Sequence, residues 1–290
     1  MLVNEAVSLI HAFPGVTSLC GYGCLSGKIG VFDSETNQHI FSFVGPESLN
    51  TLIASDEKIL YFSDKNRIAS YDLRAKQAPV EVFRTVEEIT SFSIRNDKLA
   101  ICNSENGMLV YDTRNMKERL DMKKNDRIPD ICCFNQNNEI IVSYSDLSVC
   151  MFKHNSDEIF QLEVSESATI QGIKPMGMFC IDNTLIIGYY SGISIYENYN
   201  LKQYYQHSLD STFSSVTAAP CFSESTVAYS TSEGNIYPLC TSSKSPSRPV
   251  KLNGVNINRI SANHLMIAVA DDQDDGYIGV MMPEDYGIEN

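Results

Sequence analysis

Two short segments place a carboxylate and a guanidinium two positions apart in the chain, directly after an aromatic side chain. They are Tyr71-Asp72-Leu73-Arg74 and Tyr111-Asp112-Thr113-Arg114. A guanidinium is planar and always charged, so an exposed arginine can make bidentate contacts with a partner or stack on it. Alternatively, the aspartate begins a turn after a strand, and the arginine is solvated or forms a local ion pair. The residues alone leave both interpretations open.

The charge of the whole chain limits the class of partner. The formal net charge is −14, from 36 acidic and 22 basic residues. Such a chain repels phosphate backbones and anionic lipid and attracts basic surfaces. We therefore expect protein partners, including a basic peptide or protein, and neither nucleic acid nor a membrane.

Two loops could be taken for cofactor sites. Gly21–Gly27 is rich in glycine like a phosphate loop, but it lies inside an expected hairpin with no helix N-terminus to hold a phosphate. Asp271–Gly276 suggests calcium, yet Gln273 occupies the third ligand position and Met282 stands where a bidentate glutamate belongs. We expect a tight turn and a solvated loop instead, although the acidic loop could still meet a basic partner.

The cysteines and histidines do not form a recognisable catalytic or metal site. There are nine cysteines and five histidines, without a Cys-x-x-Cys pair, and zinc normally needs four clustered ligands. Most cysteines lie in apolar strand-like runs, where a free thiol packs as a small hydrophobe in a reducing compartment. No Gly-x-Ser-x-Gly elbow occurs. We expect no cofactor, no metal and no catalysis; an enzyme or metal protein is the remaining alternative.

The elements that must position these residues are hairpins. In the clearest one, an apolar strand (Leu99–Cys102) leads into a polar turn (Asn103–Gly107) and a second apolar strand (Met108–Tyr111). Two strands alone are marginally stable in water, so neighbouring units must extend and cover the hairpin.

The hairpin recurs along the whole chain. Seven copies align on the residue near the end of the second hairpin strand, namely Phe32, Tyr71, Tyr111, Phe152, Tyr196, Tyr237 and Met281. Their spacings of 39, 40, 41, 44, 41 and 44 residues match the period of about 40 to 45 residues of a four-stranded propeller blade. The sequence therefore predicts an all-β, seven-bladed β-propeller.

We expect one domain over residues 1–290. The predicted blades span 5–45, 46–85, 86–124, 125–165, 166–210, 211–253 and 254–290, with no segment of helical length between them. The last unit is short, so its outer strand must come from Asp285–Asn290, from an extended Met1–Val3 or from another chain.

The repeat resembles the WD-repeat family of β-propellers over nearly the whole chain, through its period, its strand order and the aromatic-Asp ending. The chain departs from the family because it has no Trp and no Gly-His pair opens its units. The run Val86–Ser93, which follows Tyr71–Arg74, is similar to the group formed by WD repeat-containing protein 53 and its relatives.

This resemblance implies a protein-binding scaffold inside the cell. The two Tyr-Asp-x-Arg segments look like the box by which WD-repeat substrate receptors dock onto the propeller adaptor of cullin-RING ubiquitin ligases, which would place Arg74 and Arg114 on the docking rim. The alternative is a scaffold of another complex that binds a basic peptide or tail at the channel mouth near Glu87, Glu88 and Asp130.

Overall fold

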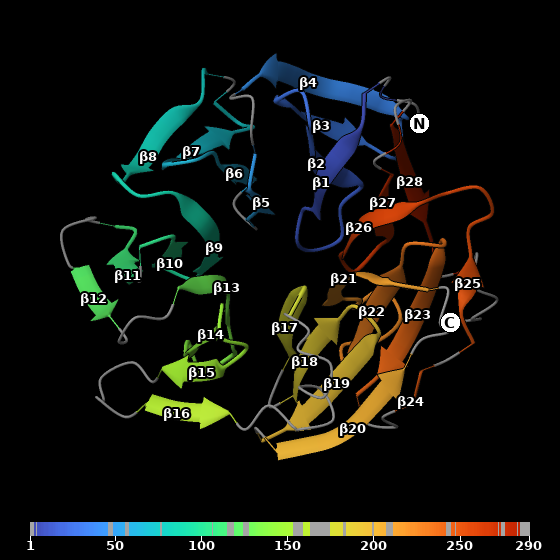
Figure 1. Cartoon of the computed structure of the whole chain (residues 1–290). Helices are drawn as coiled ribbons and strands as arrows, with labels where there is room; N and C mark the ends of the chain where they lie inside the picture. The colour runs from blue at the N-terminus through green and yellow to red at the C-terminus, as the bar shows by residue number, and fades with distance from the viewer. Residues whose placement is uncertain are drawn as a thin grey trace. The chain divides into compact units, whose positions relative to one another are not determined.

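The computed structural model describes residues 3, 5–45, 49–55, 58–75, 77–105, 107–114, 119–123, 128–152, 159–162, 175–181, 184–198, 200–206, 211–241, 245–246, 248–271, 273, 276–282 and 284. The regular elements in these residues are β-strands (Figure 1). No helix in this part of the chain is long and apolar enough to cross a membrane. Two compact units are described separately below: unit 1 is Met1–Asp64, Ile68–Phe83 and His207–Asn290, and unit 2 is Lys65–Arg67 and Arg84–Gln206. The expectation of a single domain stays a prediction.

Unit 1 contains four antiparallel sheets. The first is β1 (Val7–Ala12), β2 (Leu19–Cys24), β3 (Lys28–Asp33) and β4 (Gln38–Val44). The second is β5 (Thr51–Ala54), β6 (Ile59–Ser63), β7 (Arg67–Asp72) and β8 (Val80–Arg84), although Arg67 and Arg84 are grouped with unit 2. The third is β21 (Phe213–Ala218), β22 (Thr226–Thr231), β23 (Asn235–Cys240), β24 (Ser245–Pro246) and β25 (Val250–Lys251). The fourth is β26 (Ile257–Ala262), β27 (Ile267–Asp271) and β28 (Tyr277–Met281).

Unit 2 contains three antiparallel sheets of four strands each. The first is β9 (Ile89–Arg95), β10 (Lys98–Asn103), β11 (Gly107–Asp112) and β12 (Arg119–Lys123). The second is β13 (Pro129–Phe134), β14 (Ile140–Tyr144), β15 (Val149–Phe152) and β16 (Ile159–Leu162). The third is β17 (Gly177–Ile181), β18 (Thr184–Tyr189), β19 (Gly192–Glu197) and β20 (Asn200–Gln206). In each sheet the strands lie side by side in chain order (Figure 1).

The hairpin predicted around residues 99–111 is present as β10 and β11. Lys98 lies opposite Asp112 and Cys102 opposite Met108. The side chain of Asn103 forms the turn, because its Oδ1 accepts hydrogen bonds from the backbone N–H groups of Glu105 and Gly107, both at 3.1 Å. A short amide that bonds its own backbone in this way favours a turn over a longer strand.

Six of the seven residues on which the units were aligned, from Phe32 to Met281, occupy equivalent positions in their sheets; Tyr237 does not. Tyr196 lies opposite Leu185, and the equivalent pair in the next sheet is Leu239 opposite Val227. The sequence alignment on Tyr237 is therefore wrong by two positions. Tyr237 lies in mid-strand, where its ring stacks on that of Tyr229 with centroids 4.8 Å apart.

A β-bulge recurs near the start of the innermost strand. The register shifts by one residue there in five sheets, and the extra residue is polar each time: Ser8, Thr90, Asp130, Ser214 and Asn258. A bulge bends its strand and redirects side chains. At its bulge, the Thr90 hydroxyl donates a hydrogen bond to the carbonyl of Pro129 at 3.1 Å. This bond joins the starts of β9 and β13.

The sheets are stabilised by burial on both faces. In β14, Ile140, Val142 and Tyr144 pack in one cluster with the β9–β12 sheet, whereas Ile141 packs in another with the β17–β20 sheet. A strand covered on both sides reads as a continuous apolar run rather than an alternating one. Seven of the nine cysteines are buried and all nine are free thiols.

The β26–β28 sheet has three strands among the described residues. Beside it, Val3 is buried in the same cluster as Ile278, and its N–H donates to the carbonyl of Gly276 at 2.9 Å. This bond favours the predicted closure by the N-terminal segment. Met1, Leu2 and 285–290 lie outside the described residues.

Gly276 lies where the N-terminal segment meets the β26–β28 sheet. Its φ is +46°, and an added Cβ would overlap the backbone carbonyl of Glu5. We expect Gly276→Ala to lower the free energy of unfolding by about 3 kcal/mol, since it adds a steric overlap to the left-handed strain.

Gly254→Ala is the matched control for Gly276→Ala. Gly254 has a φ of +75° but no atom within 4 Å of the added Cβ, so its substitution should cost only about 1 kcal/mol. Urea unfolding of both variants measures the difference, and equal losses would contradict the contact between Gly276 and Glu5.

Candidate functional site

The first Tyr-Asp-x-Arg segment ends β7 in unit 1 with a closed local structure. Asp72 Oδ1 accepts the backbone N–H of Arg74 at 2.8 Å, which makes an Asx turn. The guanidinium of the same arginine donates to both carboxylate oxygens, from Nε at 3.0 Å and from Nη2 at 2.9 Å. This bidentate pair fixes the guanidinium while leaving the Arg74 side chain 57% exposed.

The second segment repeats this geometry in unit 2. Asp112 Oδ1 accepts the backbone N–H and the Nε of Arg114, both at 2.9 Å, and its second oxygen accepts Nη2. Arg114 Nη1 also lies 3.6 Å from Asp97, and the arginine side chain is 68% exposed. The ion pair anticipated as the alternative interpretation is therefore present in both segments, and both arginines are still accessible.

The two tyrosines serve sheet packing. Tyr71 is half-buried and stacks on Phe41 of β4, with ring centroids 4.0 Å apart. Tyr111 is buried in β11 opposite Leu99. In these segments the accessible group is consequently the guanidinium, and the part predicted for Tyr71 and Tyr111 in partner binding stays a prediction.

The Asp72 and Asp112 carboxylates are stabilised in their charged form. Hydrogen bonds from the Arg74 side chain lower the pKa of Asp72 to about 2, and those from Arg114 do the same for the pKa of Asp112. Both pairs therefore persist at neutral pH.

The acidic candidates lie at the neighbouring starts of β9 and β13 in unit 2. Glu88 is exposed and its carbonyl accepts the N–H of Ser104 at 2.8 Å, whereas Glu87 is half-buried and accepts from the hydroxyl of Thr85. Asp130 is the half-buried bulge residue of β13. The hydrogen bond between Thr90 and Pro129 holds these two strand starts together, so the structure brings the three acids to one end of unit 2.

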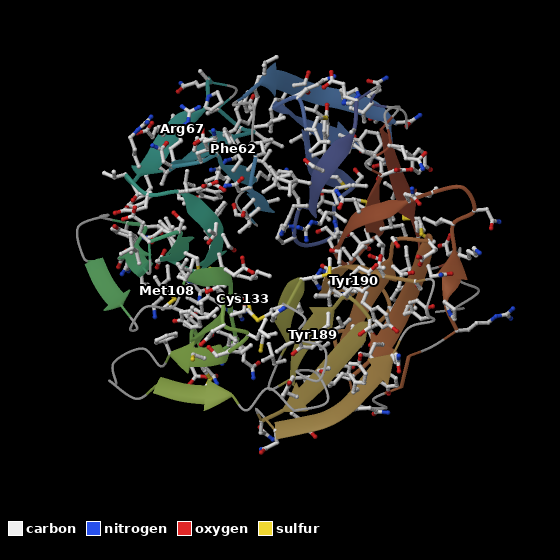
Figure 2. All side chains as sticks on the ribbon, viewed as in Figure 1. Phe62, Arg67, Met108, Cys133, Tyr189 and Tyr190 are labelled. Carbon is white, nitrogen blue, oxygen red and sulfur yellow. The ribbon has the colours of Figure 1, made fainter. Side chains whose placement is uncertain are left out.

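Exposed apolar side chains share this end of the sheets. Val86 is 93% exposed and precedes β9, Ile128 is 41% exposed and precedes β13, and Met176 is 41% exposed and precedes β17. Tyr190 is 55% exposed on the turn after β18 (Figure 2). The N–H of Met176 donates to the carbonyl of Gly188 at 2.8 Å, which ties the start of β17 to the end of β18.

We name this set the acidic-apolar surface: Val86, Glu87, Glu88, Ile128, Asp130, Met176 and Tyr190. The sequence pattern alone did not indicate its four apolar members. Three of them lie just before an innermost strand, and Tyr190 lies on the turn between the second and third strands of its sheet. Aligning these positions across the repeats would have indicated them.

Basic side chains also border the acidic-apolar surface. Lys65 is exposed and its carbonyl accepts the N–H of Ile89 at 2.6 Å; Arg67 is half-buried two residues further on (Figure 2). The backbone of Lys65 therefore lies next to the start of β9, beside the acidic-apolar surface.

The two loops that the sequence singled out as possible cofactor sites are turns where the structure describes them. Gly21–Gly27 forms the end of β2 and the following turn. Asp271 uses its Oδ1 to accept the N–H of Gln273 at 2.9 Å, and Asp272, Asp274 and Asp275 lie outside the described residues. Within the described ranges, no group of three or more His, Cys, Asp or Glu could hold a metal ion.

Comparison with known proteins identifies the fold. No protein-family model matches the chain, and no curated protein matches it in sequence. The chain is similar to the crystal structure of the β-propeller domain of Cps50 (Swd1) from Myceliophteria thermophila, with a TM-score of 0.76, 11% sequence identity, and coverage of 95% of this chain and 96% of that chain. The protein has the fold of a seven-bladed β-propeller, which confirms the predicted fold class; the resemblance to the WD-repeat family stays a prediction. The similarity to the group of WD repeat-containing protein 53 stays a prediction.

The arginine pairs predict a distinct titration. By carbon NMR, the Asp72 and Asp112 carboxyl groups should titrate with pKa values of about 2. Because the folded-state pKa lies below the ordinary value of about 3.9, the stabilisation is complete above pH 4 and is lost as the pH falls through 2. Arg74→Met should raise the pKa of Asp72 alone, and Arg114→Met that of Asp112 alone. An unchanged pKa in either variant would contradict the pairing.

Proposed function

We propose that this protein is a non-catalytic scaffold of an intracellular complex and that its acidic-apolar surface binds a basic, partly apolar segment of a partner protein. The observation that carries this proposal is the coincidence of Val86, Met176 and Tyr190, all exposed, with Glu87, Glu88 and Asp130 at one end of unit 2.

The apolar side chains supply the main driving force for binding. Four large apolar side chains exposed at corresponding ends of three sheets are typical of a recognition surface. Burying apolar area contributes about 25 cal/mol per Å², and an aromatic such as Tyr190 is a frequent anchor at the centre of protein interfaces. The partner segment should accordingly present at least one apolar side chain.

The carboxylates define the charge of the partner. The −14 net charge of the chain attracts basic segments over distances of about a Debye length, roughly 8 Å in physiological salt. Rim carboxylates mainly increase the association rate and reject acidic partners. A segment with several lysines or arginines around an apolar anchor fits both properties.

A second function rests on the two Asp-Arg pairs. We also propose docking of the propeller adaptor of a cullin-RING ubiquitin ligase by Arg74 and Arg114, as a substrate receptor would. The observation in its favour is that two separate segments hold an exposed guanidinium in the same bidentate geometry. A guanidinium fixed in this way loses little conformational entropy on binding.

The acidic-apolar surface is tested with a fluorescent probe peptide of alternating lysine and leucine. The triple variant Glu87→Gln, Glu88→Gln, Asp130→Asn should bind the probe about tenfold more weakly by anisotropy, because each rim charge contributes on the order of 0.5 kcal/mol. Higher salt should weaken binding to the native protein, and Val86→Ser with Tyr190→Ser should weaken it at every salt concentration.

The matched control removes three exposed carboxylates of unit 1, with Glu35→Gln, Glu224→Gln and Glu284→Gln. It changes the net charge equally and should leave probe binding within about twofold of the native value. Equal losses in the two triple variants would show that the peptide responds only to total charge, and the proposed site would then be wrong.

The docking proposal is tested by affinity capture from cell lysate. The double variant Arg74→Ala, Arg114→Ala should lose the ligase adaptor while its melting temperature stays nearly unchanged, because exposed ion pairs contribute little to stability. Arg248→Ala, an exposed arginine outside the two segments, should retain it. Undiminished capture by the double variant would contradict adaptor docking through these arginines.

A further inference from the structure

Arg259 is a cation in an unusual place. It lies on β26, the innermost strand of its sheet in unit 1, and its side chain is half-buried. Among the residues described in unit 1 and unit 2, none forms a hydrogen bond or an ion pair with its guanidinium. This distinguishes it from Arg74 and Arg114, each of which is paired with a carboxylate.

The strand register places Arg259 on the face of β26 that meets β1. Arg259 lies opposite Ala270, and Ala270 packs in one cluster with Ile10 and Ala12 of β1. Ser261 lies two residues further along β26, on the same face, where its Oγ accepts the N–H of Ala12 at 2.9 Å. The guanidinium therefore leaves the strand at the seam between β26 and β1.

The equivalent positions in other sheets confirm this direction. Arg259 is the residue that follows the bulge in β26. In the other four sheets with such a bulge, the corresponding residues are Leu9, Ser91, Ile131 and Ser215. Ser215 Oγ donates to the carbonyl of Ile260 at 3.4 Å, and Ser91 Oγ lies 4.0 Å from the sulfur of Cys132. In both sheets this position contacts the next innermost strand, and Arg259 is the charged member of the set.

The polar groups that the structure describes near Arg259 leave its charge uncompensated. Asn258 Nδ2, on the bulge next to Arg259, donates to the carbonyl of Ser8 at 3.2 Å and so joins the two strands beside the guanidinium. The nearest acid on the paired strand, Asp271, is used by the backbone N–H of Gln273. Burial lowers the pKa of the Arg259 guanidinium below its ordinary value, with no opposing charge to raise it.

An arginine remains charged at neutral pH even when its pKa falls, because its ordinary pKa lies far above neutrality. Withdrawing a cation from water without a counter-charge is costly, and replacing it by an apolar side chain of similar length is then neutral or stabilising. The cost disappears if an anion binds, since a guanidinium offers two parallel N–H groups to two oxygens.

We propose that Arg259 forms a binding site for a small oxyanion, a carboxylate or a phosphate, at the seam between β26 and β1. The anion supplies the counter-charge that the described residues do not, and it links two innermost strands. This site is separate from the acidic-apolar surface, which belongs to unit 2, and it selects ligands of the opposite charge.

The experiment is thermal unfolding of the full chain at constant ionic strength in chloride, with inorganic phosphate or acetate added to 10 mM. The melting temperature of the native protein should rise with either anion, by about 2 °C for a ligand at ten times its dissociation constant. In Arg259→Met the rise should be absent. This variant should also unfold in chloride at the native temperature or above it, because methionine keeps the apolar stem and removes the charge.

Arg248→Met is the control, since Arg248 is an exposed arginine of the same unit, and it should keep the full rise. Arg259→Lys retains the charge without the planar fork and should bind the anions about tenfold more weakly.

A rise in melting temperature with both anions, or with phosphate alone, supports the site. The absence of any rise in the native protein, or an equal rise in Arg259→Met, overturns it. A shift of the Arg259 Nε signal on phosphate addition gives a second readout that does not depend on stability.

Discussion

Burial of the sheets against their neighbours within each unit is the constraint on which the rest of this structure depends. A sheet of four short strands cannot cover its own apolar faces, so its stability comes from neighbouring sheets of the same unit. The second strands show this most clearly, since every residue of β14, β22 and β27 is buried. Within unit 2, the β13–β16 sheet shares one cluster with the sheet before it and another with the sheet after it. The cysteines belong to this packing, and burial raises the pKa of thiols such as Cys133, so they behave as hydrophobes.

This constraint moves recognition to the strand ends. A strand buried on both faces has no side chain left for a partner, whereas the turns and the residues before the innermost strands are solvated. The acidic-apolar surface and the two Asp-Arg pairs all occupy such positions. The bulge contributes as well, because in five sheets it turns one polar residue, such as Asp130 or Asn258, out of the alternating pattern of the innermost strand.

The two Tyr-Asp-x-Arg segments show one sequence pattern serving structure and surface together. The tyrosine packs on a sheet, the aspartate forms the turn, and the arginine closes a bidentate pair with that aspartate. The structural interpretation of these residues is therefore correct, and it does not exclude the docking interpretation, since the guanidinium is both fixed and accessible. Arg259 presents the opposite case. None of the described carboxylates pairs with it, and its position between two strands far apart in sequence gives it a chemistry that neither strand shows alone.

The amino-acid sequence by itself determined the repeat, its period, the antiparallel hairpins and the turns, because these depend on residues within a few positions of one another. Asn103 and Asp72 illustrate this, since each side chain bonds its own backbone nearby. Only the tertiary structure decided which side chains are exposed or left without a counter-charge. Whether Val86 is solvated or Arg259 is paired depends on strands distant in sequence, and the shift from Tyr237 to Leu239 became visible only in the register with β22. Local hydrogen bonding is set by neighbours in the chain, whereas burial and charge compensation are set by neighbours in space.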